Sequence, residues 1–197
     1  MLTVACELRL TELDQRWEIL ESVDQMAGPQ TLLPDIATFQ RADTPERLER
    51  FLARVAAYPA YIGAISDLVR EGAATGLTQP PIIVERTIAQ LERLLAVPAA
   101  QHPVVEALAV AGDPERARVV AAIERHARPA DTAYLELLRT TYLPKARAAA
   151  GLSAVPNGEA LYRSRILAWT TLPLDPAEVH RIGLEEMEAI EGERRAI

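Results

Sequence analysis

The feature that most limits how this chain can fold is a helix-start signal that recurs along it. The signal joins a capping residue, a proline and an acidic residue, and it occurs at residues 44–46 (TPE), 112–115 (GDPE) and 175–178 (DPAE). Proline has the φ angle of a first helical turn and lacks the N–H that this turn leaves unbonded, while the acid opposes the positive end of the helix dipole. The sequence therefore predicts helices that begin near residues 45, 113 and 176.

The apolar residues between these signals favour helices over strands. Leu48, Phe51, Leu52 and Val55 follow the first signal at helical spacing. Aromatic residues make up only 5% of the chain, and no run of β-branched residues alternates between turn signals. We expect an all-α domain of about eight helices with short loops, in which neighbouring helices form antiparallel pairs.

Proline and glycine set the expected helix boundaries. Tyr58-Pro59 and Arg128-Pro129 each predict a break, and Pro144 predicts a kink or break near Leu143. We expect a single helical domain over residues 1–197, with an arm and connector at 1–43 and a main body at 44–197. The expected helices are 7–25, 45–58, 59–74, 81–97, 113–127, 131–150, 159–170 and one from 176 onward, whose pattern still runs at Ile197. That unfinished pattern suggests the N-terminal portion of a longer protein.

Charge and composition exclude several classes of function. The net charge of −7 argues against nonspecific nucleic-acid binding, which needs a basic surface. No apolar run approaches the roughly 18 residues of a membrane span, and the first ten residues lack the basic start of a signal peptide. Cys6 is the single cysteine. We therefore expect a cytoplasmic protein that binds neither nucleic acid nor membrane.

The sequence contains no recognisable catalytic or metal-binding motif. The three histidines, His102, His126 and His180, do not have the spacing of a zinc-binding helix, and there is no His-Glu-x-x-His, phosphate loop or Gly-x-Ser-x-Gly. We expect each histidine to be a surface or structural residue. The chain is thus expected to hold no catalytic residue, no metal and no cofactor of its own.

Two charged residues interrupt the apolar faces of the last two expected helices. Arg165 lies among Leu161, Tyr162, Ile166 and Trp169, and Glu186 lies among Val179, Ile182, Gly183 and Ile190. In one interpretation the two charges neutralise each other or other buried partners, which the rarity of unpaired buried charge favours. In the other, they line a polar cleft that holds a ligand such as a peptide terminus.

Several blocks of sequence resemble the N-terminal part of the bacterial domain of unknown function 885 family. They span the chain from about Leu13 onward at 54–60 (RVAAYPA), 70–80 (REGAATGLTQP), 84–91 (VERTIAQL), 142–147 (YLPKAR), 156–162 (PNGEALY), 170–171 (TT) and 176–184 (PAEVHRIGL). The resemblance implies a helical, zincin-like zinc-dependent metallopeptidase or hydrolase in a longer chain. Its His-Glu-x-x-His helix would lie beyond the region matched here, so no catalytic residue can be carried over.

What the resemblance leaves for this chain is a helical wall beside a substrate cleft. The residues expected to contact a peptide substrate there are Tyr162, Arg165, His180 and Glu186, and zinc would belong to the longer protein. The expected partner is the remainder of the same chain, or a second copy of it. The alternative is a free-standing helical module for protein interaction or oligomerisation. A small-ligand enzyme without a recognisable motif is the third option.

Overall fold

The computed structural model describes residues 2–195, so the expectation about Ile197 lies outside the described residues. Across these residues the chain is helical, with no strand beyond an isolated bridge between Ala42 and Val110, and the all-α prediction is confirmed. The chain forms two compact units. The terminal unit joins Met1–Trp17 to Gly151–Ile197, and the central unit comprises Glu18–Ala150.

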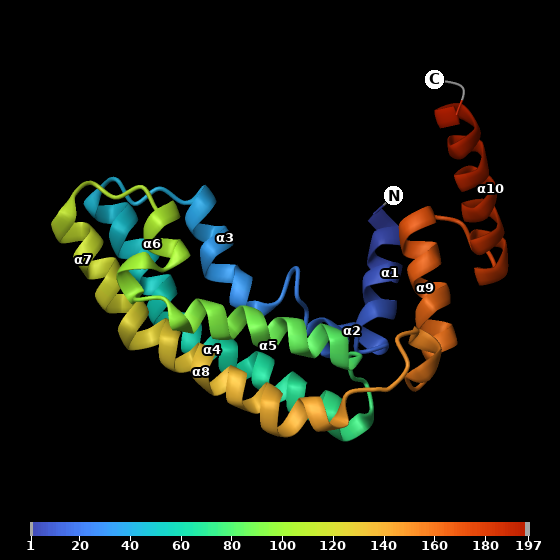
Figure 1. The fold of residues 1–197 in the computed structure, drawn as a ribbon, viewed down its shortest axis with the longest axis horizontal. Coiled ribbons are helices and arrows are strands. Elements are labelled where there is room, and N and C mark those ends of the chain that lie inside the picture. Colours follow the sequence, from blue (N-terminus) through green and yellow to red (C-terminus); the bar gives the residue numbers. More distant parts are fainter. Residues whose placement is uncertain (1, 196–197) are drawn as a thin grey trace. The chain divides into compact units, whose positions relative to one another are not determined.

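The central unit is built from three helical rods, two of which run in the same direction and one in the opposite direction (Figure 1). Helix α4 (Pro45–Thr75) packs against a rod built from α7 (Asp113–Ala122), η3 (Ile123–Ala127), α8 (Arg128–Leu137), η4 (Leu138–Tyr142) and η5 (Leu143–Lys145), and α5 (Pro81–Ala96) packs on α8. The remaining elements are α2 (Trp17–Glu21), which contains the boundary between the units, η1 (Pro29–Thr31), α3 (Leu32–Phe39), η2 (Ala99–Gln101) and α6 (Pro103–Ala107).

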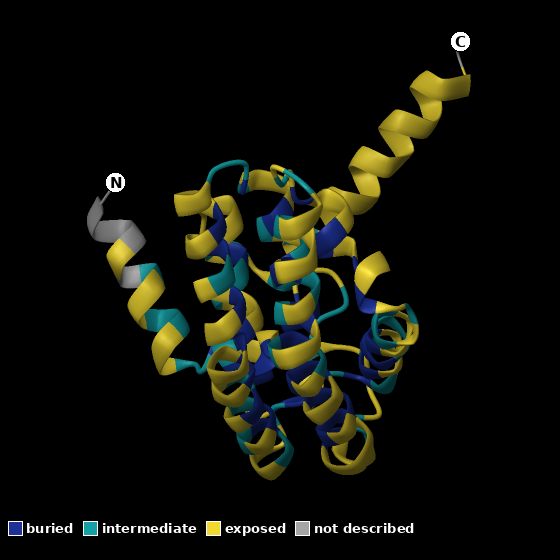
Figure 2. Cartoon of the chain, turned by 90° about the vertical axis from the view of Figure 1, so that its left-hand side faces the viewer, coloured by how far each residue is buried: buried dark blue, intermediate teal, exposed yellow. Residues whose placement is uncertain are grey.

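Side-chain contacts define the directions of these rods. Glu49 pairs with Arg118 near the starts of α4 and α7, and Tyr58 bonds to Asp131 further along both, so these two rods run in the same direction. Arg139 pairs with Glu92, whereas Arg128 reaches the carbonyl of Leu95, so α5 runs antiparallel to α8. Buried residues line the facing sides of the rods (Figure 2).

The predicted start signals are confirmed, because α4, α7 and α10 (Pro176–Arg195) begin where they were expected. The Thr44 side chain accepts a hydrogen bond from the Arg47 N–H and caps α4. Gly76 ends that helix with a φ of 81°, a conformation in which a residue with a Cβ is strained. These signals are local, so they act in the same way in any tertiary context.

Four predicted boundaries are wrong. The expected helix 7–25 is interrupted after α1 (Leu2–Asp14), where Arg16 has a φ of 56°. Pro59 lies inside the continuous helix α4, and Pro129 does not close the rod that contains it. Near Leu143, where a kink or break was expected, the rod changes from the π-helical η4 to the 3-10 helix η5, and it ends at Lys145, well before the expected Gly151.

The second rod tolerates its two interior prolines, Pro129 and Pro144, because a π-helical segment precedes each of them. Proline clashes with the carbonyl four residues before it and cannot donate a hydrogen bond. In η3 the Arg128 N–H bonds to Ile123 O, and in η4 the Leu143 N–H bonds to Leu138 O, five residues back in each case. The wider turn moves the carbonyl away from Pro129 or Pro144, so the rod continues where an α-helix would kink.

The terminal unit consists of α1, η6 (Leu152–Ala154), α9 (Gly158–Thr170) and α10. Helix α9 packs against α1 and buries Leu161 and Ile166. None of the residues of α10 is buried, and all but Pro176 and Val179 are exposed, as the yellow of that helix shows in Figure 2. No helix among the described residues is long and apolar enough to cross a membrane.

Candidate functional site

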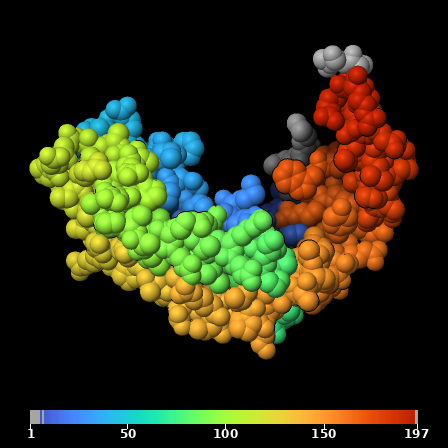
Figure 3. Space-filling view, in the orientation of Figure 1, coloured from blue at the N-terminus to red at the C-terminus, as the bar shows by residue number. Residues whose placement is uncertain are grey.

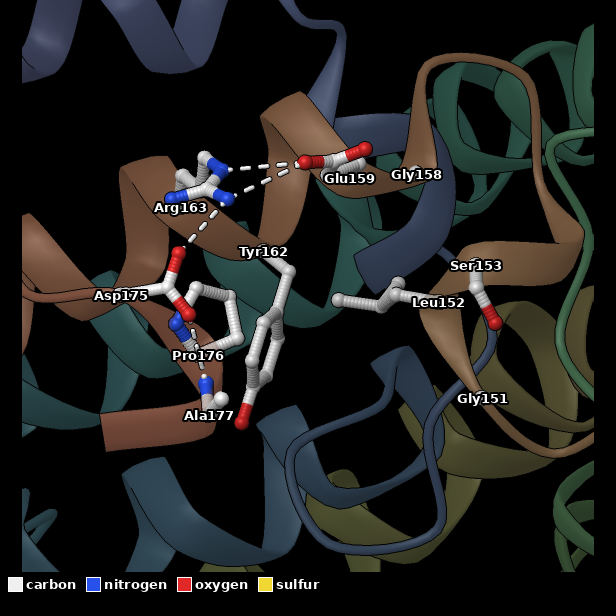
Figure 4. A pocket seen from close by; sticks show the side chains of 10 residues that line it. All are labelled: Gly151, Leu152, Ser153, Gly158, Glu159, Tyr162, Arg163, Asp175, Pro176 and Ala177. Carbon is white, nitrogen blue, oxygen red and sulfur yellow. Dashed lines mark hydrogen bonds and ion pairs between the residues drawn. The ribbon is translucent and has the colours of Figure 1, made fainter. Parts of the chain in front are cut away.

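The terminal unit has a surface pocket at the point where η6 and the first turns of α9 and α10 meet (Figure 4). Its volume is about 560 Å³, and apolar atoms dominate its walls. The lining residues are Gly151, Leu152, Ser153, Gly158, Glu159, Tyr162, Arg163, Asp175, Pro176 and Ala177. We take this pocket as the candidate site because it contains Tyr162, one of the residues predicted to contact a substrate.

A close backbone approach forms one side of the pocket. Asn157 adopts a left-handed conformation with a φ of 55°, and it turns the chain directly into α9. A Cβ placed on Gly158 would lie 1.7 Å from Leu152 O. Position 158 therefore requires glycine to bring η6 against the start of α9, which is the physical reason for the Asn-Gly sequence at this turn.

Charged groups at the rim hold the two helices of the pocket together. Arg163 donates to Glu159 Oε1 at 3.2 Å and to Asp175 Oδ2 at 2.9 Å, as Figure 4 shows. Asp175 Oδ1 accepts the Ala177 N–H at 2.9 Å and so caps α10. The hydrogen bond from the Ala177 N–H and, to a lesser extent, the one from Arg163 lower the pKa of the Asp175 carboxyl. Both carboxylates at this rim are thus paired with the one guanidinium.

Tyr162 is the chemically distinctive residue of the pocket interior. The residue is 43% exposed, and Figure 4 places its ring between Leu152 on one side and the start of α10 on the other. A phenol in an apolar pocket can bury an apolar group and hydrogen-bond its polar end. The pocket has the chemistry of a binding site for an apolar side chain, since the acids and base at its rim are engaged in ion pairs.

Arg165 does not pair with Glu186, so that part of the first interpretation is wrong. Its guanidinium lies 2.6 Å from Glu12 Oε1 and 3.8 Å from the ring centroid of Trp17. The Arg9 side chain, together with Arg165, holds the pKa of the Glu12 carboxyl below its usual value. The pairing failed because α10 exposes its apolar stripe, which leaves Glu186 in solvent, where it needs no partner.

The structure does not bring the four predicted contact residues together. Tyr162 lines the pocket, Arg165 lies on the side of α9 that faces α1, and His180 and Glu186 are exposed on α10. The sequence reasoning missed Arg163 and its partner Glu159. Their spacing of four residues on one helix face was the signal that could have found them.

The histidines agree with the structural role expected of them where the structure tests it. His102 is 2% exposed and caps α6, because its Nδ1 accepts the Val104 N–H at 3.2 Å. His126 is partly buried, and His180 is exposed. Among the residues that the structure describes, no group of three potential metal ligands lies close enough to hold an ion.

Comparisons with known proteins place this geometry in a family. No curated protein matches the chain. A solved structure that does match is that of "the putative lipoprotein from Colwellia psychrerythraea", with a TM-score of 0.78 and 22% sequence identity. The match covers 86% of this chain but only 31% of that one, so the likeness extends over less than a third of the longer protein. The model of the bacterial proteins of unknown function called DUF885 matches residues 2–197, and this chain therefore belongs to the DUF885 family.

Proposed function

We propose that this chain is the N-terminal helical part of a longer, zincin-like zinc-dependent peptidase, and that it has no activity by itself. The observation that carries the proposal is the exposure of α10: this helix has 20 residues, and none of them is buried. Ile182, Met187 and Ile190 are 38%, 64% and 61% exposed. In the space-filling view the red atoms of α10 lie open on the face turned to the viewer (Figure 3).

An amphipathic helix that leaves its apolar stripe in water gains little from being folded against its own unit. A contiguous exposed stripe of this kind is typical of a surface that another part of a protein covers. The length of the solved relative, most of which lies outside the match, supports a remainder of the chain as the covering partner. Zinc and the peptidase chemistry would belong to that remainder.

Within this proposal the pocket receives an apolar side chain of a peptide substrate. Tyr162 is its contact residue, and Arg163 orders the rim by joining α9 to the start of α10. His180 and Glu186 would lie at the edge between α10 and its covering partner, since both are exposed on that helix. Arg165 would act indirectly, by fixing α1 to α9 through Glu12. We also propose a cytoplasmic location, because Cys6 is the chain's single cysteine and cannot form the internal disulfide that is typical of oxidising compartments.

Reading the gene beyond the codon for Ile197 is the first test. We expect the frame to continue into a helix with His-Glu-x-x-His, and the longer product to bind zinc and hydrolyse a casein probe until a chelator is added. Residues 1–197 alone should show neither property. A stop codon directly after Ile197 would contradict the proposal.

The same exposed stripe supports one other function, a free-standing module that self-associates. Sedimentation of residues 1–197 over a range of concentrations distinguishes the two. The module predicts a discrete dimer, and Met187→Glu should return it to a monomer by placing a charge on the buried stripe. A partial protein instead predicts open-ended association or a monomer. Glu185→Gln, which also changes one charge but lies about 160° around α10 from Met187, is the control.

A further inference from the structure

In a buried cluster of the central unit, one tyrosine hydroxyl lies within hydrogen-bond distance of two acceptors, although it has only one proton to donate. Tyr58 and Asp131 are only 3% and 2% exposed. The hydroxyl oxygen of Tyr58 lies 2.8 Å from Asp131 Oδ1 and 3.1 Å from the carbonyl oxygen of Pro29. The three groups come from α4, α8 and η1, so the arrangement joins three elements that are far apart in the sequence.

The single proton of the Tyr58 hydroxyl can serve only one of these two acceptors. If Asp131 is ionised, the hydroxyl donates to the carboxylate, and its lone pairs then face the Pro29 carbonyl. If Asp131 is protonated, its own O–H donates to the Tyr58 oxygen, and Tyr58 donates to Pro29. Only the protonated acid satisfies both short contacts at once.

The surroundings of Asp131 favour the protonated acid. Burial raises the pKa of its carboxyl to about 6, against the opposing effects of the Tyr58 hydroxyl and the Arg128 guanidinium. Arg128, on the same rod, is turned to other partners: it donates to the carbonyls of Leu95 and Val97 and lies 3.4 Å from Glu124. The other ionisable groups near Tyr58 are the phenols Tyr61 on α4 and Tyr134 on α8.

We propose that Asp131, Tyr58 and the Pro29 carbonyl form a proton-dependent clasp, which holds η1 and the start of α3 against α4 and α8. The clasp is closed when Asp131 carries a proton. When Asp131 ionises, the Tyr58 proton turns to the carboxylate, and the contact with Pro29 changes from a hydrogen bond to a repulsion between lone pairs.

Other bonds keep the segment from separating completely when the clasp opens. The Pro29 carbonyl still accepts the Leu32 N–H, and Gln30 Nε2 donates to Asp24 O at 2.8 Å and to Gln90 Oε1 at 2.9 Å. We therefore expect a local loosening of η1 and the first turn of α3. The helices α4 and α8 remain packed, because their apolar contacts do not depend on this proton.

Amide hydrogen exchange of the whole chain tests the clasp. Protection factors for the amides of residues 31–33 should fall roughly five- to tenfold between pH 5 and pH 7.5, the size expected for one lost hydrogen bond. Asp131→Asn replaces the acid by a permanent donor, so it should keep the high protection at both pH values. Tyr58→Phe should show low protection at both.

Asp67→Asn is the matched control, since Asp67 is an exposed acid on α4 and its loss should leave the pH-dependent change in place. A pH-independent protection in the parent chain, or a drop that persists in Asp131→Asn, would overturn the proposal. A ¹³C titration of the Asp131 carboxyl in the parent chain gives an answer even if a variant does not fold. A midpoint near 6 supports the clasp, and a midpoint near 4 overturns it.

Discussion

The two units use their helices in opposite ways. In the central unit each long helix buries a continuous stripe, and the large buried side chains include Tyr58, Tyr134 and Tyr142. The hydroxyl of Tyr134 donates to Ser22 O, and that of Tyr142 accepts the Gln79 N–H. In the terminal unit α9 buries a few residues and α10 none, while Trp169 is 83% exposed.

This difference indicates which unit should be stable by itself. A core that buries phenol rings must also supply partners for their hydroxyls, and the central unit does so for these three tyrosines. Within the terminal unit α10 has no buried residue, so few packing contacts in that unit stabilise this helix. The central unit should fold as a cooperative body, and α10 should contribute little to it.

The largest expected effect compares one leucine in each unit. Leu91 on α5 is fully buried, whereas Leu184 on α10 is 51% exposed. Leu91→Ala should lower the free energy of unfolding by about 2–5 kcal/mol, because it removes buried carbons and leaves a cavity. Leu184→Ala should change it by no more than about 0.5 kcal/mol. Urea unfolding followed by far-ultraviolet circular dichroism measures both.

Equal losses in the two variants would break the comparison. They would mean that α10 is packed in the isolated chain, and the proposal that it awaits a covering partner would fail with them. In a longer protein with the partner present, Leu184→Ala should become more costly than it is in residues 1–197.

A second contrast lies between two histidines. His102 is buried, and burial lowers its pKa to about 4, whereas His180 is exposed. Between pH 6.5 and pH 4 the unfolded chain therefore binds more protons at His102 than the folded one. The stability that neutral His102 contributes is complete above pH 6.5 and is lost as the pH falls through this window, by about 2–3 kcal/mol.

His102→Asn should remove this loss while it keeps a side chain that can cap α6. The quantity to measure is the difference in unfolding free energy between variant and parent from pH 4 to pH 7.5. This difference cancels the opposite slope of Asp131, whose raised pKa adds stability as the pH falls toward 4. His180→Asn should leave the profile of the parent unchanged, and a change there equal to that of His102→Asn would remove the contrast.

The sequence predicts the starts of helices better than it predicts their continuity. The cap, proline and acid at 44–46 act within one turn, so the prediction of α4 holds in the folded chain. The same local rule fails at Pro59 and Pro129, because the helix continues past both prolines. Before Pro129 the chain adopts a π turn that no local pattern announces.

The candidate site is harder to predict, because Arg165 pairs with a residue that is distant in the sequence and Glu186 lies in solvent. Tyr162 was found because it is a polar residue beside a buried face. One partner of Arg165, Glu12, is 153 residues away in the sequence, and helical periodicity contains no information about such a pairing. The pairing of Arg165 with Glu186 assumed that every apolar stripe is buried, and α10 does not meet that condition.

The smallest expected effect concerns the ion pair between α1 and α9, which should stabilise the terminal unit only weakly. The side chains of Arg165 and Glu12 are 21% and 24% exposed, so water screens their attraction in part. A double-mutant cycle with Arg165→Met and Glu12→Gln should therefore give a coupling of about 1 kcal/mol.

A further substitution, Arg165→Lys, keeps the charge but loses the flat contact with the Trp17 ring. Trp17 fluorescence in a Trp169→Phe background reports the contact, since the chain has two tryptophans. If Arg165→Lys leaves both the emission and the coupling unchanged, then the charge of Arg165, and not its contact with the Trp17 ring, is what this residue contributes to the terminal unit.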